Sequence, residues 1–328
     1  MLPFDKMPVQ QATLQRLAQI PNLTISEHVW LSRYTRFGIG GPADLYVETP
    51  FEPSFMMALN IVRASGAEFA VIGGGTNLIV SDAGFRGIVL RFTSGGILND
   101  GRMVHVDAGA ELQTLVDYTI SHGLQGLETM TGIPGSVGAA IYGNAGAYGH
   151  SINERVRQVR FFDGATIRVF GNADCEFHYR ESIFKRHKGW IIFSTELELA
   201  PASADELQRT ADGILKVRLE KYPATMKCAG SIFKNLILAE LPEAVQRQVP
   251  ERVIREGKVP SAYFLEQVGA KGIRNGGIRV AEYHANLIYN EGQGTAQELC
   301  EIIADLKSRV QNRFGLTLEE EVQYVGFG

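Results

Sequence analysis

Apolar residues recur along the chain with two spacings, which together predict helices mixed with short strands. Repeats of three and four residues predict helices over 8–20, 53–65, 111–122, 204–220, 261–268 and 295–312. Short apolar runs, or apolar and polar residues in alternation, predict strands over 29–31, 44–49, 69–73, 78–80, 87–92, 103–107, 156–162, 166–170, 190–200, 276–280, 286–290 and 316–325. The order of these elements indicates an α+β fold.

Two turn motifs predict hairpins in the middle of the chain. Asn99-Asp-Gly101 joins 95–98 to 103–107, and Asp163-Gly164 joins 156–162 to 166–170. The first hairpin is expected to open a second lobe.

The stretch 126–149 is too rich in glycine and alanine for an ordinary core and too irregular for a linker. Its glycines remove side chains where something bulky lies on the backbone. A backbone with exposed N–H groups and no Cβ atoms in the way predicts a wall for a flat cofactor that carries phosphates. A tightly packed loop without a ligand is the alternative. The glycines are Gly132, Gly135, Gly138, Gly143, Gly146 and Gly149.

A second glycine cluster is Gly73-Gly-Gly-Thr-Asn77. It lacks the spacing and the following helix of a dinucleotide fingerprint, and it lacks the Gly-Lys-Ser/Thr of a P-loop. Three glycines followed by a hydroxyl and an amide suit a pyrophosphate, although a tight turn explains them equally well. A further close-approach turn is expected within 32–44.

Charge and cysteine content narrow the classes of function. The net charge is −4 and no run of Lys or Arg occurs, so nucleic-acid binding is not expected. Cys175, Cys228 and Cys300 are far apart and have no metal-ligand spacing, which favours a reducing, cytoplasmic setting without a bound metal. No signal peptide or membrane-spanning stretch is expected.

Eight motifs occur in a fixed order, and together they resemble one enzyme family. They are Tyr34-Thr-Arg-Phe-Gly-Ile-Gly-Gly41, Gly73-Gly-Gly-Thr-Asn77, Gly132-Ile-Pro-Gly-Ser-Val-Gly138, Asn144-Ala-Gly-Ala-Tyr-Gly149, Tyr179-Arg-Glu-Ser-Ile-Phe-Lys185, Ala229-Gly-Ser-Ile-Phe-Lys-Asn235, His284-Ala-Asn286 and Leu318-Glu-Glu-Glu-Val322. From about residue 30 onward, the chain resembles the UDP-N-acetylmuramate dehydrogenases, also called UDP-N-acetylenolpyruvoylglucosamine reductases.

The resemblance implies a vanillyl-alcohol-oxidase-type FAD-binding fold of two lobes with a C-terminal α+β substrate domain. The lobes are expected over 1–92, with an N-terminal arm over about 1–25, and over 93–205. The substrate domain is expected over 206–316, followed by a C-terminal strand, 317–328, that returns to the FAD-binding region. The family uses NADPH to reduce FAD, and then reduces an enolpyruvyl ether on UDP-N-acetylglucosamine to a lactyl ether in peptidoglycan synthesis.

The same resemblance assigns three catalytic residues, each with a simpler alternative. Ser231 matches the proton donor, but a serine after Gly230 could equally satisfy a turn. Arg180 matches the arginine that stabilises the substrate carboxylate, but it could instead form a salt bridge with Glu181. Glu321 matches the family glutamate because it precedes Val322; the alternative is that all three glutamates of 319–321 are solvated charges.

Cofactor and substrate contacts carry over from the matching motifs. The expected FAD contacts are Tyr34, Thr35, Gly73, Gly74, Gly75, Thr76, Asn77, Gly132, Ile133, Pro134, Gly135, Ser136, Gly138, Asn144 and Gly146. The expected substrate contacts are Lys221, Asn235, His284 and Asn286. Only a strand and a helix fit between Lys185 and Lys221, so the chain resembles the shorter class without a tyrosine-bearing insertion.

Two other functions share some of these features. A flavoenzyme of the same fold that oxidises an alcohol or hydroxy acid would keep the glycine motifs, but has no reason to keep Ser231 and Glu321. A non-catalytic nucleotide-sugar binder would be colourless when purified. The expected partner is a small-molecule substrate, and a monomer is the expected state.

Overall fold

The computed structural model describes residues 7–327, and side chains from residue 11 onward. The first part of the predicted N-terminal arm, residues 1–6, lies outside the described residues, as does Gly328. The chain forms two compact units, each made of several segments. Unit 1 is Met1–Val29, Ala43–Gly74 and Arg86–Lys221, and unit 2 is Trp30–Pro42, Gly75–Phe85 and Tyr222–Gly328.

This division differs from the predicted one at three places. The helix at 204–221 belongs to unit 1, so the boundary lies after Lys221 and not before residue 206. The segments 30–42 and 75–85, predicted within the first lobe, belong to unit 2. Contacts between residues that are far apart in sequence decide which unit a segment belongs to. These contacts cannot be read from the order of the residues alone.

Unit 1 contains two sheets. A four-stranded sheet has the order β1-β2-β5-β3, with β3 parallel to β5. A five-stranded antiparallel sheet has the order β12-β11-β13-β7-β6. The strands are β1 (Thr24–Trp30), β2 (Pro42–Thr49), β3 (Phe69–Val71), β5 (Phe85–Phe92), β6 (Ile97–Asp100), β7 (Met103–Asp107), β11 (Val156–Phe162), β12 (Ile167–Gly171) and β13 (Ile191–Glu198). Four short strands add to these as two pairs: β8 (Leu124–Gln125) with β14 (Ala200–Pro201), and β9 (Gly146–Ala147) with β10 (His150–Ser151).

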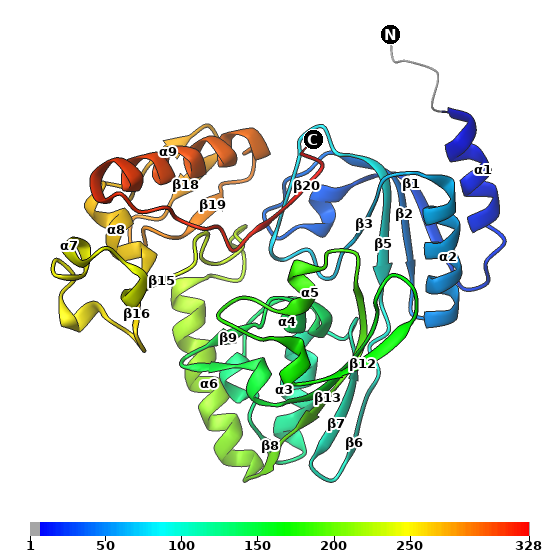
Figure 1. Cartoon of the computed structure of the whole chain (residues 1–328), viewed down its shortest axis with the longest axis horizontal. Helices are drawn as coiled ribbons and strands as arrows, with labels where there is room; N and C mark the ends of the chain where they lie inside the picture. The colour runs from blue at the N-terminus through cyan, green and yellow to red at the C-terminus, as the bar shows by residue number, and fades with distance from the viewer. Residues whose placement is uncertain (1–6, 328) are drawn as a thin grey trace. The chain divides into compact units, whose positions relative to one another are not determined.

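Unit 1 also contains helices. In Figure 1, α1 and α2 lie beside each other along the four-stranded sheet. The helices are α1 (Met7–Leu17), α2 (Glu52–Ser65), α3 (Leu112–Ser121), α4 (Val137–Tyr142), α5 (Ile183–Arg186) and α6 (Ala204–Lys221). None of the described helices is long and apolar enough to cross a membrane.

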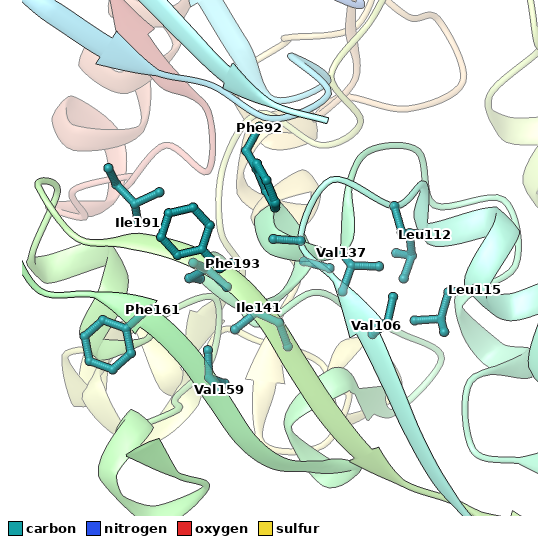
Figure 2. Close-up of a cluster of buried hydrophobic side chains, with 14 of the residues drawn as sticks. Phe92, Val106, Leu112, Leu115, Val137, Ile141, Val159, Phe161, Ile191 and Phe193 are labelled. Carbon is teal, nitrogen blue, oxygen red and sulfur yellow. The ribbon is translucent and has the colours of Figure 1, made fainter. Parts of the chain in front are cut away.

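The core of unit 1 reaches into the glycine-rich stretch. Figure 2 shows Val137 and Ile141 of α4 among buried side chains from β7, β13 and α3, including Val106, Phe193 and Leu115. Both α4 side chains are fully buried. The glycine-rich stretch is therefore anchored to the core through its own helix α4, which the sequence pattern did not predict.

Unit 2 has its own core and smaller sheets. β17, β18 and β19 form an antiparallel sheet, β15 pairs with β16, and β20 pairs parallel with β4. The strands are β4 (Leu78–Val80), β15 (Leu236–Ile237), β16 (Lys258–Val259), β17 (Arg274–Asn275), β18 (Ile278–Val280), β19 (Ile288–Asn290) and β20 (Gln323–Val325). The helices are α7 (Glu243–Gln246), α8 (Ser261–Gln267) and α9 (Ala296–Phe314). The core includes Phe233, Phe264, Leu287, Leu306 and Val322.

Most predicted elements are confirmed with small shifts of their ends, but two strands are wrong in extent. The strand predicted over 29–31 is β1, which begins at Thr24 and ends at Trp30, and Leu31 begins a 3-10 turn. A strand was predicted over 316–325, whereas β20 spans Gln323–Val325 only. Leu316 and Leu318 are buried while Thr317 and Glu319 are exposed, so the alternation itself is real. Alternation of buried and exposed residues shows which side of the chain faces the core. A strand also needs a neighbouring strand to pair with, and this pattern does not predict one.

Candidate functional site

The two glycine clusters meet inside unit 1. A Cβ added to Gly73 would lie 2.5 Å from the Ser136 hydroxyl oxygen, and one added to Gly74 would lie 3.1 Å from Gly135 Cα. Two loops that are about sixty residues apart in sequence thus touch through bare backbone. Both loops were predicted to bind the cofactor, and the structure brings them together.

The N–H groups of these four residues, Gly73, Gly74, Gly135 and Ser136, face no acceptor within the part of the chain that the structure describes. The Ser136 hydroxyl accepts from Ala139 N at 3.4 Å and so caps α4. Several neighbouring backbone donors without an acceptor among the described residues suit an anion such as a pyrophosphate. The residues present therefore fit the phosphate part of a dinucleotide cofactor.

Other glycines of the stretch are required by the protein itself. A Cβ on Gly138 would lie 2.8 Å from Ala108 Cβ, and one on Gly146 would lie 2.8 Å from Ser151 Cβ. The prediction that all these glycines clear space for a ligand is therefore wrong for Gly138 and Gly146. They permit one part of the chain to pack on another, as the alternative interpretation proposed.

Gly132 is held by a residue that the sequence analysis did not select. Gly132 has a φ of 76°, and its N–H donates to Gln113 Oε1 at 2.6 Å. The Gln113 amide in turn donates to Asp117 at 2.7 Å. No motif marks Gln113, since a glutamine near the start of a helix is an ordinary surface residue.

The predicted cofactor residues of unit 2 lie around Gly75. The N–H of Arg36 donates to Gly75 O at 3.4 Å, which places the turn after Thr35 against the second glycine cluster. The Thr35 hydroxyl donates to Ile39 O at 2.7 Å and accepts from Ile39 N at 3.2 Å. Its only donor is used within its own turn, so the structure gives the Thr35 side chain a structural role.

Arg180 lies in unit 1 in a left-handed backbone conformation with a φ of 58°. Its guanidinium donates to Gly146 O at 2.7 Å, which ties it to the glycine-rich stretch. Asn144 donates from its amide to His178 O at 2.8 Å and accepts from Asn153 N at 3.3 Å. The structure therefore uses Asn144, predicted as a cofactor contact, to hold the turn that carries Arg180.

Ser231 and Glu321 lie in unit 2, in segments that pair with each other. The N–H of Glu321 donates to Ile232 O at 2.8 Å, the N–H of Lys234 donates to Glu319 O at 2.9 Å, and Phe233 bridges Glu320 between them. Glu321 thus pairs with the residue that follows Ser231, although ninety positions separate them in sequence. The ladder ends there, because Glu321 and Val322 form a bend before β20.

The three consecutive glutamates have separate surroundings. Glu319 forms an ion pair with the buried Lys234. Both carboxylate oxygens of Glu320 accept from Lys307 of α9 at 2.9 Å. The Glu321 carbonyl accepts from the Asn77 amide at 2.8 Å, which links it to the second glycine cluster. Two of the three glutamates, Glu319 and Glu320, therefore form ion pairs with lysines of unit 2.

Asn286 supports the Ser231 segment from the opposite side. Its side-chain oxygen accepts from Phe233 N at 2.9 Å, while its amide donates to Phe233 O at 2.8 Å and to the Ser261 hydroxyl at 2.7 Å. The side chain is buried, and both amide hydrogens are used inside the protein. His284 accepts from Asn286 N at 3.2 Å. These two residues shape the loop that holds Ser231.

The remaining predicted residues are placed as follows. Asn235 accepts from Ser261 N at 3.4 Å. Lys221 is the last residue of α6.

Burial raises the pKa of Cys175 to about 12 and also raises the pKa of Cys228, so neither thiol is ionised near neutral pH. No group of three His, Cys, Asp or Glu among the described residues could hold a metal.

Comparisons with known proteins identify related sequences over both units. Residues 54–169 match the family model described as an FAD binding domain, and residues 222–325 match the C-terminal domain of UDP-N-acetylenolpyruvoylglucosamine reductase. A reductase of that name from Solibacter usitatus is 65% identical over 311 residues, covering 95% of this chain and 100% of the relative. One from Rubrobacter xylanophilus is 35% identical, covering 97% and 99%. The crystal structure of the Thermus caldophilus reductase aligns with a TM-score of 0.72 at 28% identity, covering 92% and 99%.

Proposed function

Because this chain belongs to the UDP-N-acetylenolpyruvoylglucosamine reductase family, we propose that Arg180, Ser231 and Glu321 carry the reaction of that family. The chain has the vanillyl-alcohol-oxidase-type FAD fold, and it reduces UDP-N-acetylglucosamine enolpyruvate with FAD and NADPH in peptidoglycan precursor synthesis. The observation that carries the proposal is the pairing of the Ser231 and Glu321 segments within unit 2.

The backbone of the two glycine clusters is proposed to hold the FAD pyrophosphate. The N–H groups of Gly73, Gly74, Gly135 and Ser136 are the donors, since they have no acceptor among the described residues. When bound, FAD supplies the hydride for the terminal enolpyruvyl carbon. Gln113 keeps Gly132 in place, and so acts on the cofactor loop without touching the cofactor itself.

Ser231 is proposed to give the proton to the carbon next to the one that receives the hydride. In this proposal its hydroxyl is the proton donor, and hydrogen bonds to Asn286 hold the two residues that follow it. Ile232 N donates to Asn286 O at 3.1 Å, and Phe233 is bonded twice to the Asn286 side chain. A proton donor must hold its position while the reacting carbon changes geometry, and this double anchoring serves that purpose.

Arg180 and Glu321 are proposed to stabilise the negative charge that develops on the substrate carboxylate. A guanidinium is always charged and offers a planar fork of donors that matches a carboxylate. An ionised glutamate would repel the same charge. Glu321 can therefore assist only as the neutral acid, which donates a hydrogen bond to the developing enediolate.

We propose two different roles for the predicted substrate contacts. Lys221 remains a candidate for a diphosphate contact because a flexible ammonium suits a phosphate. Asn235, His284 and Asn286 are proposed to act mainly by shaping the Ser231 loop, because their described bonds are internal. The monomeric state, the cytoplasmic location and the absence of nucleic-acid and membrane partners remain predictions.

A two-step mixing experiment tests the proposal as a whole. Purified yellow protein is mixed with NADPH, and then with the enolpyruvyl UDP-sugar, while flavin absorbance is followed. We expect bleaching in the first step and recovery in the second, with UDP-N-acetylmuramate as product. Recovery driven only by oxygen or by small alcohols would favour another flavoenzyme of this fold, and a colourless protein would favour a sugar-nucleotide binder.

Gly73→Ala is expected to weaken FAD binding. The added Cβ lies 2.5 Å from the Ser136 hydroxyl oxygen, so either this hydroxyl leaves its position at the start of α4 or the two glycine loops separate. Overpacking typically costs roughly 1–3 kcal/mol, which corresponds to a loss of about tenfold to a hundredfold in affinity if the strain falls on the bound loop. Fluorescence titration of the apoprotein with FAD measures the change.

Gly213→Ala is the matched control for that substitution. Gly213 lies in the middle of α6, where nothing is within 4 Å of an added Cβ. Alanine there should leave FAD affinity unchanged, and should raise stability by roughly 0.5–1 kcal/mol. Equal FAD affinity in both variants would contradict the assignment of the glycine loops to the cofactor.

A further inference from the structure

The turn that carries Arg180 has a backbone that needs support. Arg180 has a φ of 58°, in the left-handed region that residues with a Cβ rarely adopt. His178 and Glu181 close the turn by exchanging two backbone hydrogen bonds, of 3.0 and 3.1 Å. Strained backbone of this kind persists only where its surroundings hold it, and it is concentrated at functional sites.

Lys185 provides a direct hold on this turn. Its ammonium donates to Arg180 O at 3.0 Å and to Glu181 Oε1 at 2.8 Å. The Lys185 side chain thus forms hydrogen bonds with both the backbone of Arg180 and the side chain of the next residue, Glu181. The Lys185 side chain is 13% exposed, so this is not the solvated ion pair that an (i, i+4) spacing on a helix surface usually gives.

The lysine is itself fixed in place by the start of α5. The Ser182 hydroxyl accepts from Lys185 N at 3.3 Å and donates to Tyr142 O at 2.7 Å, and Ser182 is fully buried. Tyr142 ends α4, the helix that anchors the glycine-rich stretch. Burial, and then the charge of Glu181, raise the pKa of the Tyr142 hydroxyl. The turn is therefore connected to the core of unit 1 through Lys185 and Ser182.

From these contacts we propose that Lys185 is a positioning residue, which holds the left-handed Arg180 turn so that the guanidinium is presented to the substrate carboxylate. This inference rests on the proposed role of Arg180. Lys185 touches neither substrate nor cofactor in this proposal; it acts on the reaction only through the geometry of Arg180. Losing its charge and its two hydrogen bonds lets the turn relax toward ordinary backbone conformations, and displaces the guanidinium.

The test compares Lys185→Met with wild-type holoenzyme in the two half-reactions. Misplacing a catalytic group by about 1 Å costs on the order of a hundredfold, so we expect reoxidation by the enolpyruvyl sugar to slow by roughly tenfold to a hundredfold. Flavin reduction by NADPH should stay near the wild-type rate. Lys185→Arg keeps the charge and the donors, and should restore most of the loss. Lys188→Met removes an exposed lysine of the same segment, and should change neither rate.

A double-mutant cycle shows whether Lys185 acts through Arg180. In an Arg180→Ala background, Lys185→Met should add little further loss, because the group that it positions is gone. Hydrogen exchange of the Glu181 amide, which bonds to His178 O, should be faster in Lys185→Met than in wild type. This readout does not depend on turnover.

Each outcome separates this inference from the proposed function. Additive losses in the cycle, or unchanged reoxidation in Lys185→Met beside a slow Arg180→Ala, would overturn the role of Lys185 alone. A wild-type rate in Arg180→Ala would overturn the role of Arg180 itself. If Lys185→Met does not fold, Lys185→Gln keeps a donor for the Arg180 carbonyl, and should fall between wild type and Arg180→Ala; a rate equal to wild type would contradict the proposal.

Discussion

Ser231→Ala should stop the reduced enzyme from being reoxidised by substrate, while leaving its reduction by NADPH nearly normal. General acid catalysis typically contributes about 10²–10⁴-fold, and we expect a loss of this size in the oxidative half-reaction. The substitution removes one oxygen from a half-buried residue whose backbone is held by its neighbours. The fold and the FAD content should therefore be unchanged, and stopped-flow absorbance measures both half-reactions separately.

Ser231→Cys is the matched control for this prediction. A thiol is close in size to a hydroxyl and is the stronger acid, so the cysteine variant should retain much more activity than the alanine variant. Reoxidation at the wild-type rate in Ser231→Ala would show that another group donates the proton. Equal, severe losses in both variants would show that the site tolerates no change in shape, and would remove the support for an acid role.

The sequence predicted best where a local physical cause sets the structure. Thr295 and Glu298 form a capping box at the start of α9, close to the predicted start at residue 295. The hairpin near Asn99 is confirmed, but Asp100 pairs with Met103, so that the loop is Gly101-Arg102. Gly101, with a φ of 56°, takes the left-handed position, one residue later than the centre of the predicted turn.

The sequence predicts candidate catalytic residues, but it does not predict the residues that hold them in place. The motifs predict catalytic roles for Arg180, Ser231 and Glu321, because functional residue types recur in recognisable local contexts. Gln113 lies in none of these motifs, and Lys185 ends one of them without a role that the motif assigns. Their contacts, a hydrogen bond to Gly132 and one to the carbonyl of Arg180, appear only in the folded chain. Likewise, a glycine that clears space for a ligand and one that clears space for Ala108, as Gly138 does, look identical in a sequence. Contacts between distant segments decide these roles.

Arg180→Ala should slow reoxidation by about a hundredfold, the effect of losing a donor worth roughly 3 kcal/mol to a developing oxyanion. Arg180→Lys keeps the charge but loses the planar fork, so its rate should lie between those of Arg180→Ala and wild type. Flavin reduction by NADPH should be little affected in both variants. A wild-type oxidative half-reaction in Arg180→Ala would remove this residue from the mechanism.

Arg180→Gly separates the guanidinium from the backbone that carries it. Glycine adopts a φ of 58° without the left-handed penalty of roughly 1–2 kcal/mol, so Arg180→Gly should unfold at a higher denaturant concentration than Arg180→Ala. Both variants lack the guanidinium and should be equally slow in reoxidation. Such a result would mean that the wild-type enzyme keeps a strained residue because its side chain is needed there. If Arg180→Gly is no more stable than Arg180→Ala, the turn carries no strain, and Lys185 has nothing to hold in place.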